Sequence, residues 1–204
     1  EWVINDYTVS FDVHGGDQIA SITKGFDERV SIPSKATRKG CEFMWWETDS
    51  GTRAPKEYRI EARDATFRAV WLCTSLRDAD DLIDFSKVVN SGSSSFEGST
   101  VFIDGEIDFS DGLSEQFEPI GKADRNCFKG TFDGQGYVIT GLAVKSSSQY
   151  AGLFGCTDGA VIRNVVIDSS CSVTSSYSGS SDTCVGGVVG RCKGRHTNKR
   201  VQTI

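Results

Sequence analysis

The stretch FKGTFDGQGYVITGLAV, from Phe128 to Val144, decides the fold expected for this chain. Short apolar runs in it alternate with corners that contain glycine. Its last part, Ile139 to Val144, is similar to the run from Ile162 to Ile167, which starts 23 residues later (162 − 139). A repeat of that length, with strands and Gly/Asn turns and without a helical period, is typical of a solenoid of stacked strands.

Each expected coil places apolar side chains inward, in two successive sets: Ile139, Leu142 and Val144, then Ile162, Val165 and Ile167. The segments 153–155 and 188–190 form a second similar pair, 35 residues apart (188 − 153). The second spacing is longer than the first, and we attribute the extra length to a serine-rich loop between Ser169 and Asp182 that bulges from one corner.

Sharp reversals of the backbone need residues that tolerate unusual dihedral angles, chiefly glycine and asparagine. The expected turn residues are Gly15, Gly16, Gly134, Gly136, Gly141, Gly155, Asn164 and Gly190. The segment 133–136 also has some likeness to a phosphate-binding loop. It lacks the full Gly-x-Gly-x-x-Gly spacing and no helix is expected after it, so we interpret it as a tight turn.

The first third of the chain combines short alternating strands with closely spaced aromatic residues, and Trp46 and Trp71 are expected in a small core. Its ordered landmarks are Val9-x-Phe11-Asp12-x-x-Gly15-Gly16, Pro33, Lys39-Gly40-x-x-Phe43-x-x-Trp46-x-Thr48-Asp49 and Ala69-x-Trp71. They resemble the Listeria–Bacteroides repeat, also called the internalin B-repeat. This resemblance implies a small β-grasp-like module of the kind strung in tandem on surface proteins.

A second set of landmarks follows: Phe117-x-Pro119-Ile120-Gly121, Phe128-x-Gly130-Thr131-Phe132-Asp133-Gly134-x-Gly136, Gly152-Leu153-Phe154-Gly155, Ala160-x-Ile162-x-Asn164-Val165 and Val185-Gly186-Gly187-Val188-Val189-Gly190. It resembles the GLUG repeat region of bacterial adhesins and other surface proteins, which implies a right-handed parallel β-helix. Helical spacing of apolar residues predicts a helix from Asp78 to Asn90, capped at its start by Asp78 or Asp80. The resemblance implies that this helix caps the N-terminal end of the β-helix.

We therefore predict a mainly β chain in four parts. Residues 1–5 are the end of a preceding repeat, 6–72 the Listeria–Bacteroides-type module, 76–192 the GLUG-type β-helix and 193–204 an irregular or truncated tail. The chain begins at Glu1 without a methionine, which suggests a piece of a longer protein or a processed product.

Composition argues against several classes of function. A formal net charge of −6 disfavours nucleic-acid binding, and no apolar run is long enough to span a membrane. Aspartates 78, 80, 81 and 84 lack the spacing of a calcium-binding EF-hand loop and are expected to be solvated near the helix start. The seven cysteines include no Cys-x-x-Cys pair, and His14 and His196 lie far apart, so a zinc site is not expected. Disulfides in an oxidising compartment and buried free thiols both remain open.

No catalytic, cofactor-binding or metal-binding set emerges from the sequence. The zinc-peptidase motif His-Glu-x-x-His is absent, and neither histidine has a convincing catalytic setting. We expect a non-enzymatic protein of the cell envelope, at the cell surface or secreted, with an adhesive or scaffolding role. The alternative is a carbohydrate-active β-helix enzyme, a polysaccharide lyase or hydrolase, with Asp158, Arg163 and Asp168 as its candidate residues, or a non-catalytic flank of a surface peptidase.

The expected partner is an unknown glycan or a protein of a host or neighbouring cell. Long loops at the corners of solenoids often carry recognition, so the Ser169–Asp182 loop is the favoured interaction site. Its candidate contact residues are Ser169, Thr174, Tyr177 and Asp182. A disordered loop without a partner is the alternative.

Overall fold

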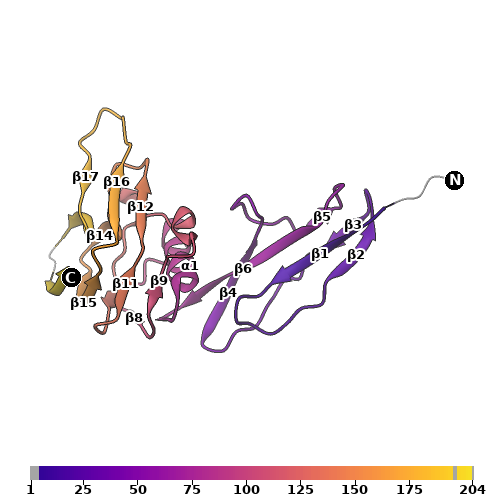
Figure 1. Ribbon diagram of the computed structural model, residues 1–204, viewed down its shortest axis with the longest axis horizontal. Helices are drawn as coiled ribbons and strands as arrows, with labels where there is room; N and C mark the ends of the chain where they lie inside the picture. The colour runs from indigo at the N-terminus through magenta and orange to yellow at the C-terminus, as the bar shows by residue number, and fades with distance from the viewer. Residues whose placement is uncertain (1–4, 195–196, 204) are drawn as a thin grey trace. The chain divides into compact units, whose positions relative to one another are not determined.

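The computed structural model describes residues 5–194 and 197–203 (Figure 1). The chain divides into two compact units, Glu1–Leu72 and Cys73–Ile204, referred to below as unit 1 and unit 2. Most of the predicted remnant of a preceding repeat, residues 1–5, lies outside the described residues. No helix in the described part of the chain is both long and apolar enough to cross a membrane.

The described part of unit 1 contains six strands. Four of them form a mixed sheet in the order β2 (Ile22–Gly25), β1 (Asp6–Asp12), β6 (Ala65–Cys73) and β4 (Cys41–Glu47). Strand β1 runs antiparallel to β2 and parallel to β6. The other two, β3 (Arg29–Ser31) and β5 (Glu57–Arg59), form an antiparallel ribbon.

An aromatic cluster fills the core of unit 1. Trp46, Phe67 and Trp71 are almost fully buried, which confirms the prediction that both tryptophans are core residues. The Phe11 ring packs on Trp46 at 5.3 Å and on Phe67 at 6.3 Å between centroids. Each indole N–H donates to a backbone carbonyl, Trp46 to Pro33 and Trp71 to Val13. The core therefore buries these large rings without leaving their polar atoms unsatisfied.

Unit 2 contains one long helix among its described residues, α1 (Ala79–Asn90). The Asp78 carboxylate caps it by accepting the backbone N–H of Asp81 at 2.9 Å, one of the two capping alternatives predicted. Its apolar face buries Leu82, Phe85 and Val88. Asp81 and Asp84 are also buried, so the prediction that these aspartates are solvated was wrong. Asp81 instead accepts the Arg77 backbone N–H at 3.0 Å, just before the helix.

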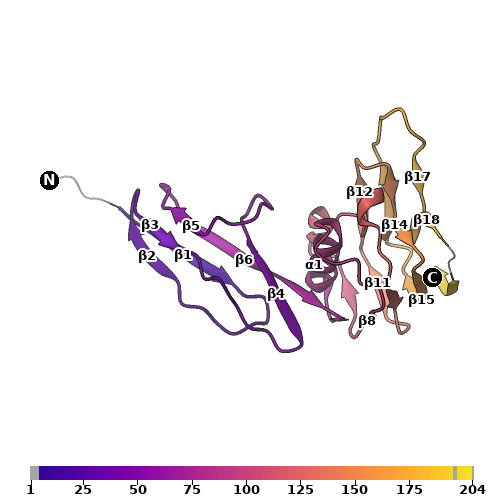
Figure 2. The same cartoon turned by 180° about the vertical axis from the view of Figure 1, so that it is seen from behind.

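Parallel pairing dominates unit 2 (Figures 1 and 2). One sheet has the order β7 (Ser75–Leu76), β8 (Thr100–Ile103), β10 (Thr131–Asp133), β15 (Val161–Ile167), β11 (Val138–Thr140) and β9 (Ile107–Asp108), and β19 (Thr197–Thr203) also pairs with β15. Three separate two-stranded sheets are β12 (Ala143–Ser146) with β16 (Ser172–Ser175), β13 (Tyr150–Ala151) with β17 (Cys184–Val185), and β14 (Phe154–Asp158) with β18 (Val189–Lys193). Two short 3-10 helices, Leu113–Gln116 and Asp124–Asn126, lie in the connections.

This arrangement overturns the predicted right-handed parallel β-helix with a capping helix. The sheets are small and separate, mixed in unit 1 and parallel in unit 2, with 42% of residues in strands and 10% in helices, and they do not form a solenoid. Gly134, Gly141 and Gly152 directly follow β10, β11 and β13, so these strands stop after two or three residues. The strands that continue the chain, β12, β13 and β14, pair in sheets of their own and do not extend the larger sheet. The mixed sheet and ribbon of unit 1 likewise replace the predicted β-grasp-like module.

The repeat that motivated the solenoid is also out of register. Ile162 pairs with Phe132, and Ile139 pairs with Ile167, so the 139–144 and 162–167 runs are not equivalent neighbours. Every buried strand needs the same apolar alternation, and similar runs therefore arise without being stacked partners. The second predicted match is confirmed, because Phe154 pairs with Val189. The tail expected to be irregular contains β19, which pairs in parallel with β15.

Candidate functional site

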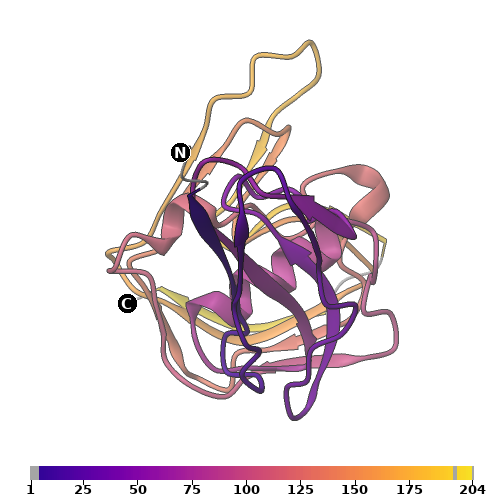
Figure 3. The ribbon, with the colours of Figure 1, turned by 90° about the vertical axis from the view of Figure 1, so that its right-hand side faces the viewer.

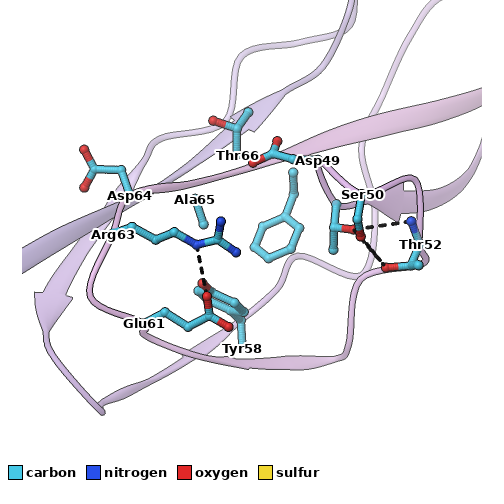
Figure 4. A pocket seen from close by; sticks show the side chains of 11 residues that line it. Asp49, Ser50, Thr52, Tyr58, Glu61, Arg63, Asp64, Ala65 and Thr66 are labelled. Atoms are coloured by element: carbon cyan, nitrogen blue, oxygen red, sulfur yellow. Dashed lines mark hydrogen bonds and ion pairs between the residues drawn. The ribbon is translucent and has the colours of Figure 1, made fainter. Parts of the chain in front are cut away.

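A pocket of about 470 Å³ opens among the loops of unit 1 (Figure 4). Two connections provide most of its lining, the one that follows β4 and the one between β5 and β6. Figure 4 shows Arg63 and Asp64 on one side and Ser50 and Thr52 on the opposite side. The lining is mostly polar, over an aromatic base.

Three hydroxyl groups form one wall. The backbone reverses after β4, where the Thr48 N–H donates to the Thr52 carbonyl at 2.8 Å. Thr48 Oγ1 lies 2.9 Å from both Ser50 Oγ and Thr52 Oγ1, and the last two lie 3.3 Å apart. Each hydroxyl has one hydrogen and two lone pairs. The three hydroxyls can donate to one another, and Thr48 Oγ1 also accepts the Thr52 backbone N–H at 3.3 Å. One acceptor lone pair each then remains on Ser50 and Thr52.

Charged side chains line the pocket as well. The carboxylates of Asp49, Glu61 and Asp64 contribute negative charge against one guanidinium, that of Arg63. Arg63 Nε donates to Glu61 Oε2 at 3.0 Å, and Asp64 Oδ1 accepts the Thr8 backbone N–H at 2.7 Å. The Asp64 bond ties the pocket loop to β1. The pocket therefore has an excess of negative charge.

The aromatic base comes from Tyr58 and Phe67. Phe67 is buried in the core, and the half-buried Tyr58 ring meets it edge to face at 5.2 Å between centroids. The contact holds the Tyr58 ring in place at the margin of the pocket. An aromatic ring beside converging hydroxyls and carboxylates is a common composition for a binding site that recognises polar ligands with an apolar face.

This pocket was not predicted from the sequence. Its two loops are separate in the chain, and neither contains a motif that points to the other. A concentration of Thr, Ser, Asp and Glu in two neighbouring loops was the available signal.

A second polar cluster lies in unit 2 around Tyr150. The Arg191 guanidinium lies over the Tyr150 ring, 5.0 Å from its centroid, and donates to the phenol oxygen. Asp124 pairs with Lys193 at 2.6 Å and with Arg191 at 3.7 Å. Burial and then the neighbouring Asp124 carboxylate raise the pKa of Tyr150, whereas the hydrogen bond to Lys193 lowers the pKa of Asp124. These groups satisfy one another, and we interpret the cluster as structural.

The disulfide Cys127–Cys156 lies beneath that cluster. Cys41 and Cys73 are disulfide-bonded as well, while Cys171, Cys184 and Cys192 are free thiols. Asp124, Cys127 and Cys156 lie close enough together to suggest a metal site. Both sulfur atoms are committed to the disulfide, however, so they are not thiolate ligands.

The eight predicted turn residues fall into two groups. Gly15, Gly136, Gly141 and Asn164 adopt positive φ angles. At Gly16, Gly134, Gly155 and Gly190 the constraint is space, because a Cβ atom would lie within 2.9 Å of a backbone oxygen. None of the eight lines the pocket of unit 1.

The predicted interaction loop is divided by a strand. Thr174 lies in β16, and Ser169 lies in the turn after β15. Tyr177 and Asp182 remain on the segment between β16 and β17, which projects from unit 2 (Figures 1 and 3). Asp182 contributes its backbone carbonyl, which accepts from Gln149 Nε2 at 2.9 Å.

The candidate residues of a polysaccharide lyase have separate partners. Arg163 pairs with Asp133 at 2.9 Å, Asp158 lies 3.9 Å from Lys129, and Asp168 accepts from the Ser170 backbone at 2.7 Å. The three thus each serve a different local contact, and no common catalytic centre is formed by these pairings.

Comparison with known proteins adds two distant relatives. The chain is 27% identical over 73 residues to a "Putative Gly-rich membrane protein" of Evansella cellulosilytica, a match that covers 35% of this chain and 8% of that protein. It is 31% identical over 49 residues to a "Putative membrane protein" of the same organism, covering 24% of this chain and 7% of that protein. No family of known proteins matches the chain, and no solved structure matches it.

Proposed function

We propose that this chain is a non-enzymatic module of a cell-surface or secreted protein, with an adhesive or scaffolding role. The observation that carries the proposal is the oxidation of four cysteines, Cys41, Cys73, Cys127 and Cys156. Disulfides persist in extracytoplasmic compartments and are rare in a reducing cytosol.

Two further observations support the same role. Both relatives are named as membrane proteins, which supports association with the cell envelope. The solvent-exposed pocket of unit 1 and the projecting segment of unit 2 offer surfaces for a partner, and long connecting segments often carry recognition. A glycan or a protein of a neighbouring cell is the expected partner.

Protease treatment of intact cells that produce the protein tests its location. We expect peptides from this chain to be released into the medium while a cytosolic marker protein stays intact. Release only after lysis would overturn the surface assignment. The adhesive role is tested by binding of the immobilised chain to cells and to extracellular-matrix proteins, with a heat-unfolded sample as control.

A further inference from the structure

The pocket of unit 1 offers more hydrogen-bond acceptors than donors, because three carboxylates line it against one guanidinium. Ionised carboxylates accept hydrogen bonds and donate none, and three of them, Asp49, Glu61 and Asp64, line the cavity. The Arg63 guanidinium is the cation of this lining, and its Nε–H donates to Glu61 while its four Nη–H donors are the charged donors left to a ligand. A ligand that satisfies this pocket must donate several hydrogen bonds.

The hydroxyl wall strengthens this requirement. The side-chain hydroxyl oxygens of Thr48, Ser50 and Thr52 lie within 3.3 Å of one another, so each hydroxyl can donate its hydrogen to a neighbouring hydroxyl. The remaining lone pairs, on Ser50 and Thr52, can accept from a ligand, because Thr48 Oγ1 also accepts the Thr52 backbone N–H. Hydrogen bonds from ligand hydroxyls to carboxylates are stronger than those between neutral groups, so the carboxylates would dominate recognition.

The charge and the lining of the pocket restrict the chemical class of ligand that it can bind. Three carboxylates against one guanidinium repel phosphates, sulfates and uronates. The Tyr58 ring, fixed against Phe67, provides an apolar surface for the C–H face of a sugar ring. A volume of about 470 Å³ is within the usual size range of small-molecule sites.

We infer that this pocket binds an uncharged pyranose segment of a polysaccharide, with vicinal hydroxyls donating to Asp49 and its neighbours and a sugar face on Tyr58. The inference rests on the proposed surface role, for which it names the ligand class.

Titration calorimetry with the full chain tests it. The probes are neutral oligosaccharides of glucose, mannose and galactose, with polygalacturonate oligomers and chitosan oligomers as the acidic and cationic comparisons. We expect binding of at least one neutral series and none of polygalacturonate. Asp49→Asn should weaken that binding about tenfold or more, as expected for a lost charge-assisted hydrogen bond. Tyr58→Leu should weaken it too, while Glu42→Gln on β4, outside the pocket, should leave it unchanged.

Asp49 is exposed and its substitution is not expected to disturb folding, which thermal melts can verify. Neutral binding that survives both Asp49→Asn and Tyr58→Leu would place the sugar elsewhere and overturn the inference. Binding of chitosan alone, of polygalacturonate, or of no oligosaccharide would also overturn it. Those outcomes leave the surface role standing if intact cells release the chain to protease, so the two proposals fail separately.

Discussion

Asp133 and Arg163 occupy matched positions on the parallel strands β10 and β15, with Asp133 Oδ2 lying 2.9 Å from Arg163 Nε. The other carboxylate oxygen accepts from the Asn164 side chain at 2.9 Å and from the Gln135 backbone at 3.0 Å. One carboxylate thus joins two strands and fixes Asn164, whose φ angle is +53°. Such a residue should contribute to the stability of unit 2.

We expect Asp133→Asn to lower the free energy of unfolding of unit 2 by about 1–2 kcal/mol at neutral pH, since hydrogen bonds to charged groups are worth that order. Partial burial by itself would raise the pKa of Asp133, but the hydrogen bonds from Asn164 and Gln135 and the charge of Arg163 outweigh it, so the pKa lies below its ordinary value. The stabilisation is therefore present above the unfolded-state pKa and is lost as the pH falls through the lower folded-state pKa.

Urea unfolding of both proteins at pH 7 and near pH 2 measures this effect. The difference between wild type and Asp133→Asn should shrink at the acidic end. Asp182→Asn, on the exposed segment between β16 and β17, serves as the matched control and should have little effect at either pH. An equal destabilisation by Asp133→Asn at both pH values would contradict the assigned role of the ionised carboxylate.

Gly134 and Gly136 are separated by one residue and differ in what constrains them. A Cβ on Gly134 would lie 2.4 Å from the Asn164 carbonyl oxygen, whereas a Cβ on Gly136 meets nothing within 4 Å but Gly136 has a φ of +82°. We expect Gly134→Ala to cost about 1–3 kcal/mol through overpacking against backbone. Gly136→Ala should cost about 1–2 kcal/mol through backbone strain alone.

Asparagine separates the two causes. It tolerates the left-handed region, so Gly136→Asn should be milder than Gly136→Ala. Gly134→Asn should be at least as harmful as Gly134→Ala because the clash begins at Cβ. Thermal melts of the four variants provide the comparison, and the reverse order at either position would refute the assignment for that glycine.

Local patterns in the sequence were informative where a single element carries its own signal. The apolar spacing and acidic start of residues 78–90 predicted α1 and its cap, and the aromatic density near Trp46 predicted a core. These features depend on neighbours in the chain. The burial of Asp81 depends instead on the segment before the helix, whose Arg77 N–H the carboxylate accepts, and local patterns do not predict it.

Strand pairing is a different problem, because register depends on partners about 30 residues away. Ile139 and Ile162 have similar surroundings in sequence, yet they pair with Ile167 and Phe132. Glycine corners end the strands after a few residues, and the chain forms several small sheets in place of one solenoid. The pocket of unit 1 was missed for the same reason, since its walls come from two loops that meet only in the folded protein.

The free cysteines differ in their environment, which predicts their reactivity. Burial, followed by the nearby Asp168 carboxylate, raises the pKa of Cys171, whose thiol donates to the Ile139 carbonyl at 3.3 Å, while Cys192 is exposed. Because the thiolate is the reactive form, Cys192 should be alkylated several-fold faster than Cys171 at pH 8. Mass spectrometry should find three alkylated cysteines in urea without reductant and seven after reduction.

Alkylation of the Cys192→Ser and Cys171→Ser variants shows which of the two measured rates belongs to which cysteine.

The Cys127–Cys156 disulfide, which joins residues 29 apart, should add about 3–4 kcal/mol to the free energy of unfolding in the chain-entropy account. Replacing both cysteines with alanine should therefore lower the midpoint of urea unfolding markedly. A count of seven alkylated cysteines without reductant would contradict the oxidised state and remove the main support for a surface location.

Shortening the projecting segment between β16 and β17 should cost little stability, although it removes the hydrogen bond from Gln149 Nε2 to the Asp182 carbonyl. Ser146 at the end of β12 pairs with Ser175 at the end of β16, and Tyr150 at the start of β13 pairs with Cys184 at the start of β17. Residues 147–149 therefore connect β12 to β13 in the same way that residues 176–183 connect β16 to β17. Three residues thus suffice where the chain uses eight. Replacing residues 176–183 with Ser-Ser-Gln, the sequence of 147–149, should leave stability unchanged or raise it by up to about 1 kcal/mol, because a shorter loop costs less entropy to close.

The same variant tests the predicted interaction role of Tyr177 and Asp182, which it removes. We expect binding of the immobilised chain to cells to fall while binding of neutral oligosaccharides to unit 1 persists. Unchanged cell binding by a folded variant would show that this segment is not the contact, and the Tyr58→Leu variant of the pocket is then the comparison that decides whether unit 1 carries the adhesion.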